Sequence, residues 1–194
     1  MSTIAEQKAA LRTQLRKARR EHAAALPKQV SALVFNRPPG PVLEMVPEGA
    51  TIGLYRADPG EAPAFSYIKF FHEAGHRVAL PRITTLKEPM HFHVHTDPYE
   101  ESDLHKGPLG LMQPAPEAEE VVPDVLFMPL VGFTANGDRL GQGGGFYDRW
   151  LETHPETIAI GMAWDIQRVD ELPVEDHDMP LKAIITSTRI YGPY

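Results

Sequence analysis

The sequence predicts a single α/β domain over residues 1–194, built on an open, mostly parallel sheet flanked by helices on both faces. Short apolar runs alternate along the chain with segments of helical periodicity. The 42% of hydrophobic and 23% of charged residues are typical of a globular domain. With 194 residues the chain can bury one substantial core, and neither an internal repeat nor a shift in composition divides it.

The N-terminal segment 3–25 has the periodicity of an amphipathic helix that packs on the body of the protein. Its apolar stripe consists of Ile4, Leu11, Leu15, Ala18 and His22. Basic residues lie along one border of the stripe, namely Lys8, Arg12 and Arg19, and others face further out, namely Arg16, Lys17 and Arg20. Periodicity alone favours a solvated charged face, and an RNA-contacting surface is a second interpretation.

A βαβ unit is expected next. After Pro27 a short helix runs to Asn36, where the proline cluster 38–41 ends it. The expected unit then consists of a strand at 51–55, a turn at 58–60, a helix at about 63–74 and a strand at 77–80. Gly75 supplies the C-terminal stop of the helix.

The second half of the chain continues the alternation. Further strands are expected at 90–94, 125–130, 157–162 and 183–187, and a helix at 146–153. Between them, residues 97–123 are rich in proline and acidic residues and have little periodicity. A connection of this length is usually functional or mobile, and it would suit the edge of a cleft. Open α/β sheets place ligands on the loops that follow their strands.

Composition limits where the protein works and what it binds. The absence of cysteine excludes disulfides and thiolate chemistry, and the formal charge of −7 disfavours nonspecific nucleic-acid binding. No apolar run is long enough for a membrane helix, and no secretory signal is present. An organelle transit peptide is the alternative for the Arg-rich start, but Glu6 and Glu21 interrupt it. We expect a soluble, cytoplasmic monomer that binds neither nucleic acid nor membrane.

The glycine-rich segment 141–145 lies between the apolar strand 125–130 and the helix at 146–153. A loop of this kind exposes backbone N–H groups, and the helix N-terminus adds partial positive charge, so phosphate can approach. Its spacing fits neither G-x-x-x-x-G-K-[ST] nor G-x-G-x-x-G, and a turn with several left-handed residues is the plainer interpretation. Arg139 precedes the glycines. Asp148 follows them, as either a Mg²⁺ ligand or a helix-start carboxylate.

The run RLGQGGGFYDRWL resembles the R-L-G-x-G-x-G-[FY]-Y-D-R signature of the 5-formyltetrahydrofolate cyclo-ligases, also called 5,10-methenyltetrahydrofolate synthetases. Further similar positions follow in the order of the family: Lys8-x-x-x-Arg12, Glu61, Leu80-Pro81-Arg82, Gln113-Pro114, residues 129–133, and Pro173-x-Glu175-x-His177-Asp178. The resemblance implies a ligase that uses ATP and Mg²⁺ to convert 5-formyltetrahydrofolate into 5,10-methenyltetrahydrofolate, with release of ADP and phosphate.

The resemblance also implies a set of site residues. Nucleotide contacts are expected from Lys8, Arg12, Arg139, Leu140, Gly141, Gln142, Gly143, Gly144, Gly145, Phe146, Tyr147 and Asp148. Folate contacts are expected from Tyr55, Glu61, Arg82 and Phe146, although the residues alone favour a plain loop carboxylate for Glu61. Asp148 and Asp178 match positions that serve the metal, while Glu175 and His177 are expected to hold their loop in place.

The family mechanism transfers the γ-phosphoryl group to the formyl oxygen, after which N10 attacks the carbon and phosphate leaves. Catalytic roles fall to Lys8, Arg139 and Asp148, since phosphoryl transfer depends on positioning and charge stabilisation. A protein that binds ATP or folate without turnover is the alternative. The chain departs from the family pattern at Thr134, Gln142, Phe146 and Lys182.

Three histidines alternate at positions 91, 93 and 95. On a strand, His91, His93 and His95 would share one face, a pattern found in some Zn²⁺ sites. A half-exposed strand with polar residues outward produces the same pattern, and no neighbouring residue completes a metal site. We therefore favour the outward-facing strand.

Overall fold

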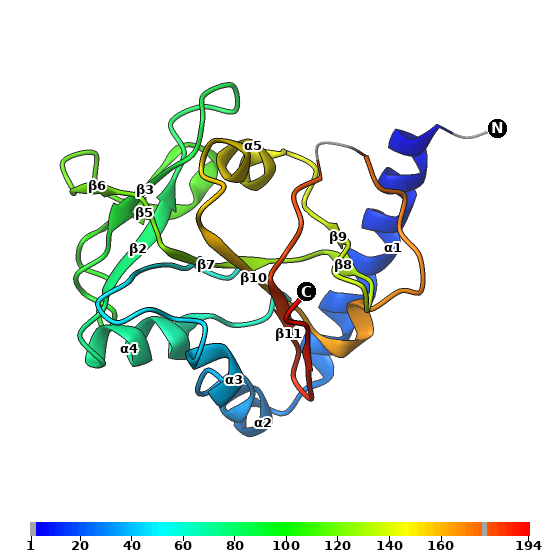
Figure 1. Cartoon of the computed structure of the whole chain (residues 1–194), viewed down its shortest axis with the longest axis horizontal. Helices are drawn as coiled ribbons and strands as arrows, with labels where there is room; N and C mark the ends of the chain where they lie inside the picture. Colours follow the sequence, from blue (N-terminus) through cyan, green and yellow to red (C-terminus); the bar gives the residue numbers. More distant parts are fainter. Residues whose placement is uncertain (1–2, 176–177) are drawn as a thin grey trace.

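An eight-stranded mixed sheet runs through the centre of the computed structural model, which describes residues 3–175 and 178–194 (Figure 1). In spatial order its strands are β12 (Ile190–Tyr191), β11 (Ala183–Ile185), β10 (Ile158–Met162), β7 (Val125–Pro129), β1 (Thr51–Gly53), β2 (Arg77–Arg82), β3 (His91–Val94) and β6 (Glu120–Val121). The five strands from β11 to β2 are parallel, whereas the edge pairings of β12 with β11, β3 with β2 and β6 with β3 are antiparallel. The prediction of a mostly parallel sheet is confirmed.

Helices cover both faces of the sheet, as predicted. On one face lie α2 (Lys28–Leu33), α3 (Gly40–Leu43) and α4 (Phe65–Glu73), and α5 (Phe146–Thr153) covers the other (Figure 1). The long helix α1 (Ile4–Ala25) stands at one end, beside the small hairpin of β8 (Gly132–Phe133) and β9 (Arg139–Leu140). Two short 3-10 helices complete the fold, η1 (Pro108–Gly110) and η2 (Asp165–Gln167). None of the helices in the described part of the chain combines the length and apolar character needed to span a bilayer.

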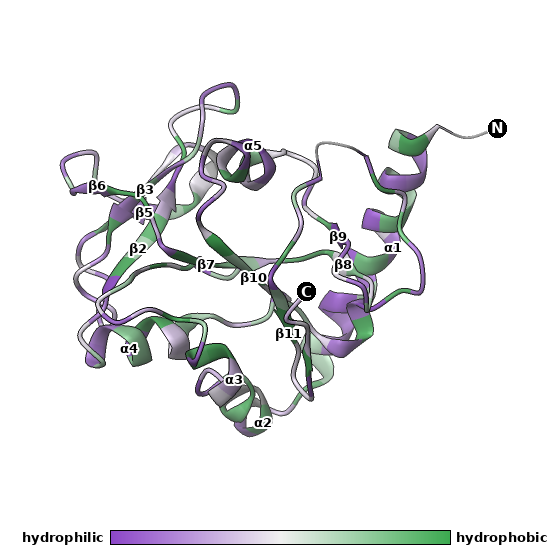
Figure 2. Cartoon of the chain, in the orientation of Figure 1, coloured by the Kyte–Doolittle hydropathy of each residue, from purple (hydrophilic) through white to green (hydrophobic). Residues whose placement is uncertain are grey.

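Strand β7 shows why the sheet is covered on both faces. Val125 and Phe127 belong to the core cluster on the α4 side, whereas Leu126 and Met128 belong to the cluster beneath α5. Successive side chains of a strand point to opposite faces, so a continuous apolar run buries both. Figure 2 shows the resulting contrast between hydrophobic central strands and hydrophilic outer loops.

Helix α1 begins and ends close to the predicted limits of 3–25. A capping box between Thr3 and Glu6 fixes its start, because each side chain accepts a hydrogen bond from the backbone N–H of the other. Leu15 packs with Val131 and Leu140 in a third core cluster. A Cβ on Gly132 would lie 2.5 Å from Leu15 Cδ1, so the hairpin can approach the helix this closely only with glycine there.

Two segments differ from prediction. The second helix ends at Leu33 rather than Asn36, and the proline cluster contains the short helix α3, since Pro41 fits the first turn of a helix. The connection 97–123, expected to be irregular, contains β6 and a hairpin of β4 (Leu104–Lys106) with β5 (Met112–Pro114). Strands of two or three residues are too short to produce a recognisable alternation.

Candidate active site

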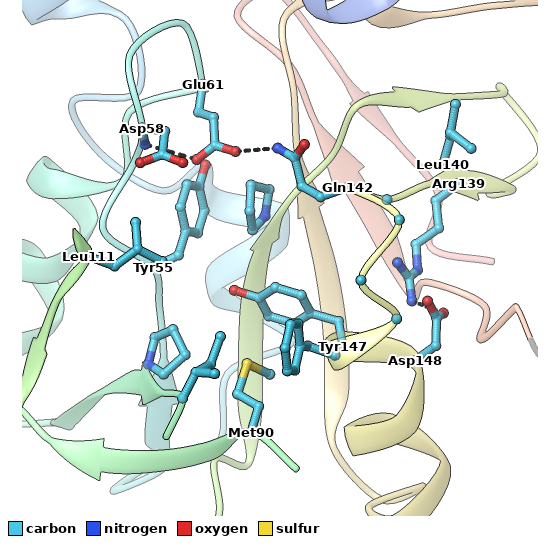
Figure 3. Close-up of a pocket in the computed structure, with 18 of the residues that line it drawn as sticks. Tyr55, Asp58, Glu61, Met90, Leu111, Arg139, Leu140, Gln142, Tyr147 and Asp148 are labelled. Atoms are coloured by element: carbon cyan, nitrogen blue, oxygen red, sulfur yellow. Dashed lines mark hydrogen bonds and ion pairs between the residues drawn. The ribbon is translucent and has the colours of Figure 1, made fainter. Parts of the chain in front are cut away.

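A cavity of about 520 Å³ opens at the carboxyl ends of the parallel strands β1, β2 and β7 (Figure 3). Its volume lies within the usual range of small-molecule sites. Tyr55 follows β1, Pro81 lies in β2, and Pro129 ends β7. The cavity therefore lies where the sequence predicted ligand binding, beyond the ends of the parallel strands. Residues 110–113 of the proline-rich connection form part of its edge.

The cavity brings together residues far apart in the sequence. Every residue predicted to contact the nucleotide or the metal lines it: Lys8, Arg12, all positions from Arg139 to Asp148, and Asp178. Of the predicted folate contacts, Tyr55, Glu61 and Phe146 line the cavity. Arg82 does not. Its guanidinium donates a hydrogen bond to Pro114 O at 2.8 Å and so joins β2 to the hairpin that carries the cavity edge.

Two cations paired with three carboxylates occupy the end of the cavity near α1 and α5. Lys8 Nζ lies 2.7 Å from both Glu175 Oε2 and Asp178 Oδ2, and Arg139 forms an ion pair with Asp148. Burial alone would lower the pKa of Lys8, but the hydrogen bonds and charges of its two partners outweigh it and raise the pKa. Burial lowers the pKa of Arg139, and Asp148 opposes this shift. Both cations remain charged at neutral pH.

The pairing of Asp148 is a role that sequence reasoning missed. The alternatives were a metal ligand and a helix-start carboxylate, yet here Asp148 also neutralises a guanidinium that is only 3% exposed. Met179 N donates a second hydrogen bond to the same carboxylate. Two of the cations expected to hold phosphate, Lys8 and Arg139, are therefore paired in this state with the carboxylates expected to hold the metal. His177, expected to support this loop, lies outside the described residues.

The glycine loop needs glycine where the chain turns toward α5. Gly143 has φ +99° and Gly145 has φ +62°, both in the left-handed region that other residues rarely adopt. Arg12 Nε donates to Gly141 O at 2.9 Å, and its guanidinium would lie 3.3 Å from a Cβ on Gly143. The loop consequently rests against α1, and its glycines line the cavity.

Glu61 lies at the opposite wall and is buried rather than an ordinary loop carboxylate. Asp58 N donates to Glu61 Oε2 at 3.0 Å, and Arg19 Nη1 lies 3.5 Å from Oε1. Burial raises the pKa of Glu61, while the Asp58 N–H and the Arg19 charge act against this shift. The nearby Tyr55 hydroxyl donates to Ala62 O and holds the same turn.

Arg16, which the sequence placed facing outward, contacts the glycine loop. Its guanidinium donates to both the side-chain and the backbone oxygen of Gln142. The spacing of Lys8, Arg12 and Arg16 at i, i+4 and i+8 places them near one face of the helix, and this signal could have identified Arg16. The buried position of Arg19 beside Glu61 depends on a contact across 42 residues, which no local pattern reveals.

Two departures from the family pattern have local partners. Thr134 is buried, donates to the Asp138 carboxylate and accepts from Asp138 N, and so closes the β8–β9 turn that leads to Arg139. Lys182 Nζ donates to Tyr194 O at 3.1 Å, away from the cavity.

The three histidines each have a partner of their own. His91 pairs with Glu120, His93 Nδ1 lies 2.7 Å from Ala118 O, and His95 pairs with Asp103. His93 and His95 are buried, so the prediction of an outward-facing histidine row was wrong for both. Across residues 3–175 and 178–194, no group of three or more His, Cys, Asp or Glu side chains could hold a metal ion.

Comparisons with known proteins agree with this architecture. Residues 4–187 match the model of the 5-formyltetrahydrofolate cyclo-ligase family. The cyclo-ligase of Escherichia coli K12 is 35% identical over 147 residues, which cover 73% of this chain and 80% of that protein. The Haemophilus influenzae cyclo-ligase is 30% identical over 183 residues, or 90% and 95% of the two chains.

Solved structures show the same fold. The 5,10-methenyltetrahydrofolate synthetase of Aquifex aeolicus superposes with a TM-score of 0.71 at 24% identity and covers 94% of this chain and 93% of its own. That of Mycoplasma pneumoniae gives 0.66 at 25% identity, with 92% and 97% covered. The predicted resemblance and the assignment as a ligase are both confirmed. The chain belongs to the 5-formyltetrahydrofolate cyclo-ligase family.

Proposed function

We propose that this protein converts 5-formyltetrahydrofolate into 5,10-methenyltetrahydrofolate with consumption of ATP, in the presence of Mg²⁺, and releases ADP and phosphate. The observation that carries the proposal is one cavity with two chemically different ends. Cations and glycine amides line one end, and Glu61 with an apolar wall lines the other. The relatives named above carry this activity in their names.

The chemistry explains why both ends are needed. An N-formyl group is a poor electrophile because its nitrogen donates into the carbonyl, so its oxygen must become a leaving group before N10 can attack. ATP supplies the phosphoryl group for this step. Lys8, Arg12 and Arg139, with the amides around Gly143, would hold the phosphates in line and stabilise the developing charge.

The donor set suits Mg²⁺ held partly by substrate. Asp148 and Asp178 line the same cavity, and the charges of both act on Arg139. Mg²⁺ commonly binds through one or two carboxylates and completes its shell with phosphate oxygens and water, so two carboxylates are sufficient. A bound Mg²⁺ would neutralise phosphate charge. Lys8 pairs with Asp178 and Arg139 with Asp148 at the wall of the cavity.

The folate end offers a polar anchor within an apolar wall. Leu80, Met90 and Leu111 line this part of the cavity and would pack against the pterin ring. The Glu61 carboxylate can accept hydrogen bonds from pterin N–H groups, and it is only 5% exposed. A buried acceptor of this kind orients the ring and rejects ligands that lack the matching donors.

The basic helix supports the small-molecule interpretation over RNA binding. Lys8 and Arg19 are buried, while Arg12 and Arg16 donate to the glycine loop. Lys17 pairs with Glu21 on the outer face. These four basic residues therefore have partners within the protein, Lys8 and Arg12 at the cavity, and we propose no nucleic-acid function.

We propose a cytoplasmic monomer as the functional unit, as expected from the sequence. Size-exclusion chromatography with light scattering tests the monomer, and a stable dimer would contradict it.

One assay separates turnover from binding alone. The protein is incubated with 5-formyltetrahydrofolate, Mg²⁺ and ATP, and the methenyl chromophore and ADP are followed together. The proposal expects both products in equal amounts, and neither without ATP. Tight binding of both ligands without either product would instead identify a binding protein and overturn the proposal.

A further inference from the structure

Gln142 is the side chain that spans the two ends of the cavity. It belongs to the glycine loop, yet its Nε2 donates to Glu61 Oε1 at 2.8 Å. Its Oε1 accepts from Arg16 Nε at 3.0 Å, and its backbone oxygen accepts from the same guanidinium. Figure 3 shows Gln142 reaching from the loop to Glu61, on the side away from the Arg139–Asp148 pair.

We propose that Gln142 is a positioning residue, which holds the glycine loop against Glu61 and keeps that carboxylate ready to accept hydrogen bonds from the folate. The inference rests on the proposed function for the identity of the two ligands.

The amide group is suited to this role because both of its ends are used. A glutamine presents an N–H donor and a carbonyl acceptor together, whereas a carboxylate only accepts and an aliphatic side chain does neither. Gln142 donates to Glu61 and accepts from Arg16 at the same time. Together the two contacts join α1, the loop and the turn after β1.

The bond from Gln142 is the shortest that Glu61 receives. Asp58 N donates at 3.0 Å and Arg19 Nη1 lies at 3.5 Å, compared with 2.8 Å for Gln142 Nε2. Burial raises the pKa of Glu61, and these three contacts oppose the shift. Loss of the Gln142 donor removes one of the groups that favour the ionised carboxylate.

The surroundings of Glu61 leave few other groups that titrate with it. The charged or titratable groups that face it are Arg19 from α1, with Arg16 behind Gln142, Asp58 from its own turn, Tyr55 after β1 and Tyr147 from α5. Burial raises the pKa of both tyrosines, so they stay neutral, and the arginines stay positive. Asp58 and Glu61 are the two carboxylates among these groups, so the acid limb of folate binding is assigned to Glu61 only by titrating Glu61 itself.

The test compares Gln142→Leu and Gln142→Glu with Gln14→Leu, a matched change at an exposed glutamine of α1. Binding of 5-formyltetrahydrofolate and of ATP is measured separately by calorimetry from pH 5 to 8, so no turnover occurs. Gln142→Leu is expected to lose about 10-fold in folate affinity at pH 7 and less in ATP affinity. Its acid limb should move to higher pH, by up to about one unit.

Gln142→Glu discriminates between the two contacts of the amide. It keeps an acceptor for Arg16 but places a second carboxylate against Glu61, so its folate binding should be weaker than that of Gln142→Leu. Wild-type folate affinity in Gln142→Glu would overturn the inference. Equal losses for folate and ATP in Gln142→Leu, without a pH shift, would also overturn it, because they indicate a merely structural role.

A ligand-free readout separates this inference from the proposed function. The carboxyl carbon of Glu61 is titrated by NMR in wild type and in Gln142→Leu, with Glu61→Gln used for assignment. A higher titration midpoint in Gln142→Leu supports the link to Glu61 even if the protein fails to bind folate, which would contradict only the proposed function. An unchanged midpoint overturns the link.

Discussion

Replacement of Asp148 by asparagine tests the charge cluster at the phosphate end of the cavity. The change removes the negative charge that faces Arg139, whose side chain is 3% exposed, but keeps an oxygen that can accept hydrogen bonds. Breaking a buried ion pair costs about 3 to 5 kcal/mol. Because Asp148 is 21% exposed and the amide preserves part of the contact, we expect a loss of about 2 kcal/mol.

A loss of this size is readily measured. For a domain of this length, about 2 kcal/mol corresponds to a decrease of about 4 to 8 °C in the melting temperature. Circular dichroism would follow unfolding of wild type, Asp148→Asn, Arg139→Met and the double variant. The double variant should be more stable than the sum of the single changes predicts, since it leaves no unpaired charge.

The same variant tests the catalytic assignment. Asp148→Asn should retain its fold and lose ATP-dependent methenyl formation, because one of the two candidate metal carboxylates is gone. A wild-type melting temperature would refute the reasoning about the ion pair. Near-normal turnover would refute the assignment of Asp148 to the metal.

Three further predictions concern other parts of the molecule. Lys8→Met should be less stable than wild type near pH 7, whereas the exposed control Lys17→Met should not. Because folding raises the pKa of Lys8, the stability that Lys8 contributes is complete below the unfolded pKa of about 10.4 and is lost as the pH rises through the folded pKa. The thermal unfolding curves of Lys8→Met and wild type should therefore converge in strong alkali. Gly143→Ala, at φ +99°, should lower the free energy of unfolding by about 1 kcal/mol and raise KM for ATP, whereas Gly49→Ala, at φ +70° with open space around it, should lower stability alone. Equal KM values for ATP in the two variants would contradict this. Phe127→Ala removes a fully buried ring that packs on Tyr67 and Phe71, so the free energy of unfolding in urea should fall by about 3 to 5 kcal/mol. A loss below about 1 kcal/mol would be inconsistent with that packing.

The sequence was informative where structure depends on local pattern. The apolar run of β7 and the stripe of α1 specify which faces are buried, and both elements lie close to the predicted positions. The glycine loop and its helix start were also recognisable, because left-handed backbone at Gly143 requires glycine. The hairpin of β4 and β5 was missed, since its strands have three residues each.

The charge pairing of the site could not be predicted in the same way. Lys8 and Asp178 are 170 residues apart, and only the fold brings them within 2.7 Å. Motif matching assigned each residue a ligand, but it gave no indication that cations and carboxylates neutralise one another before ligands bind. The bridge from Gln142 to Glu61 likewise depends on two loops that meet across the cavity.

A structure of the protein with a non-hydrolysable ATP analogue, Mg²⁺ and 5-formyltetrahydrofolate tests the central claim most directly. The account predicts both ligands in the one cavity, with the phosphates against Lys8, Arg12 and the glycine loop, and the pterin beside Glu61. Nucleotide bound away from these residues, or an empty cavity at saturating concentrations of both ligands, would contradict it.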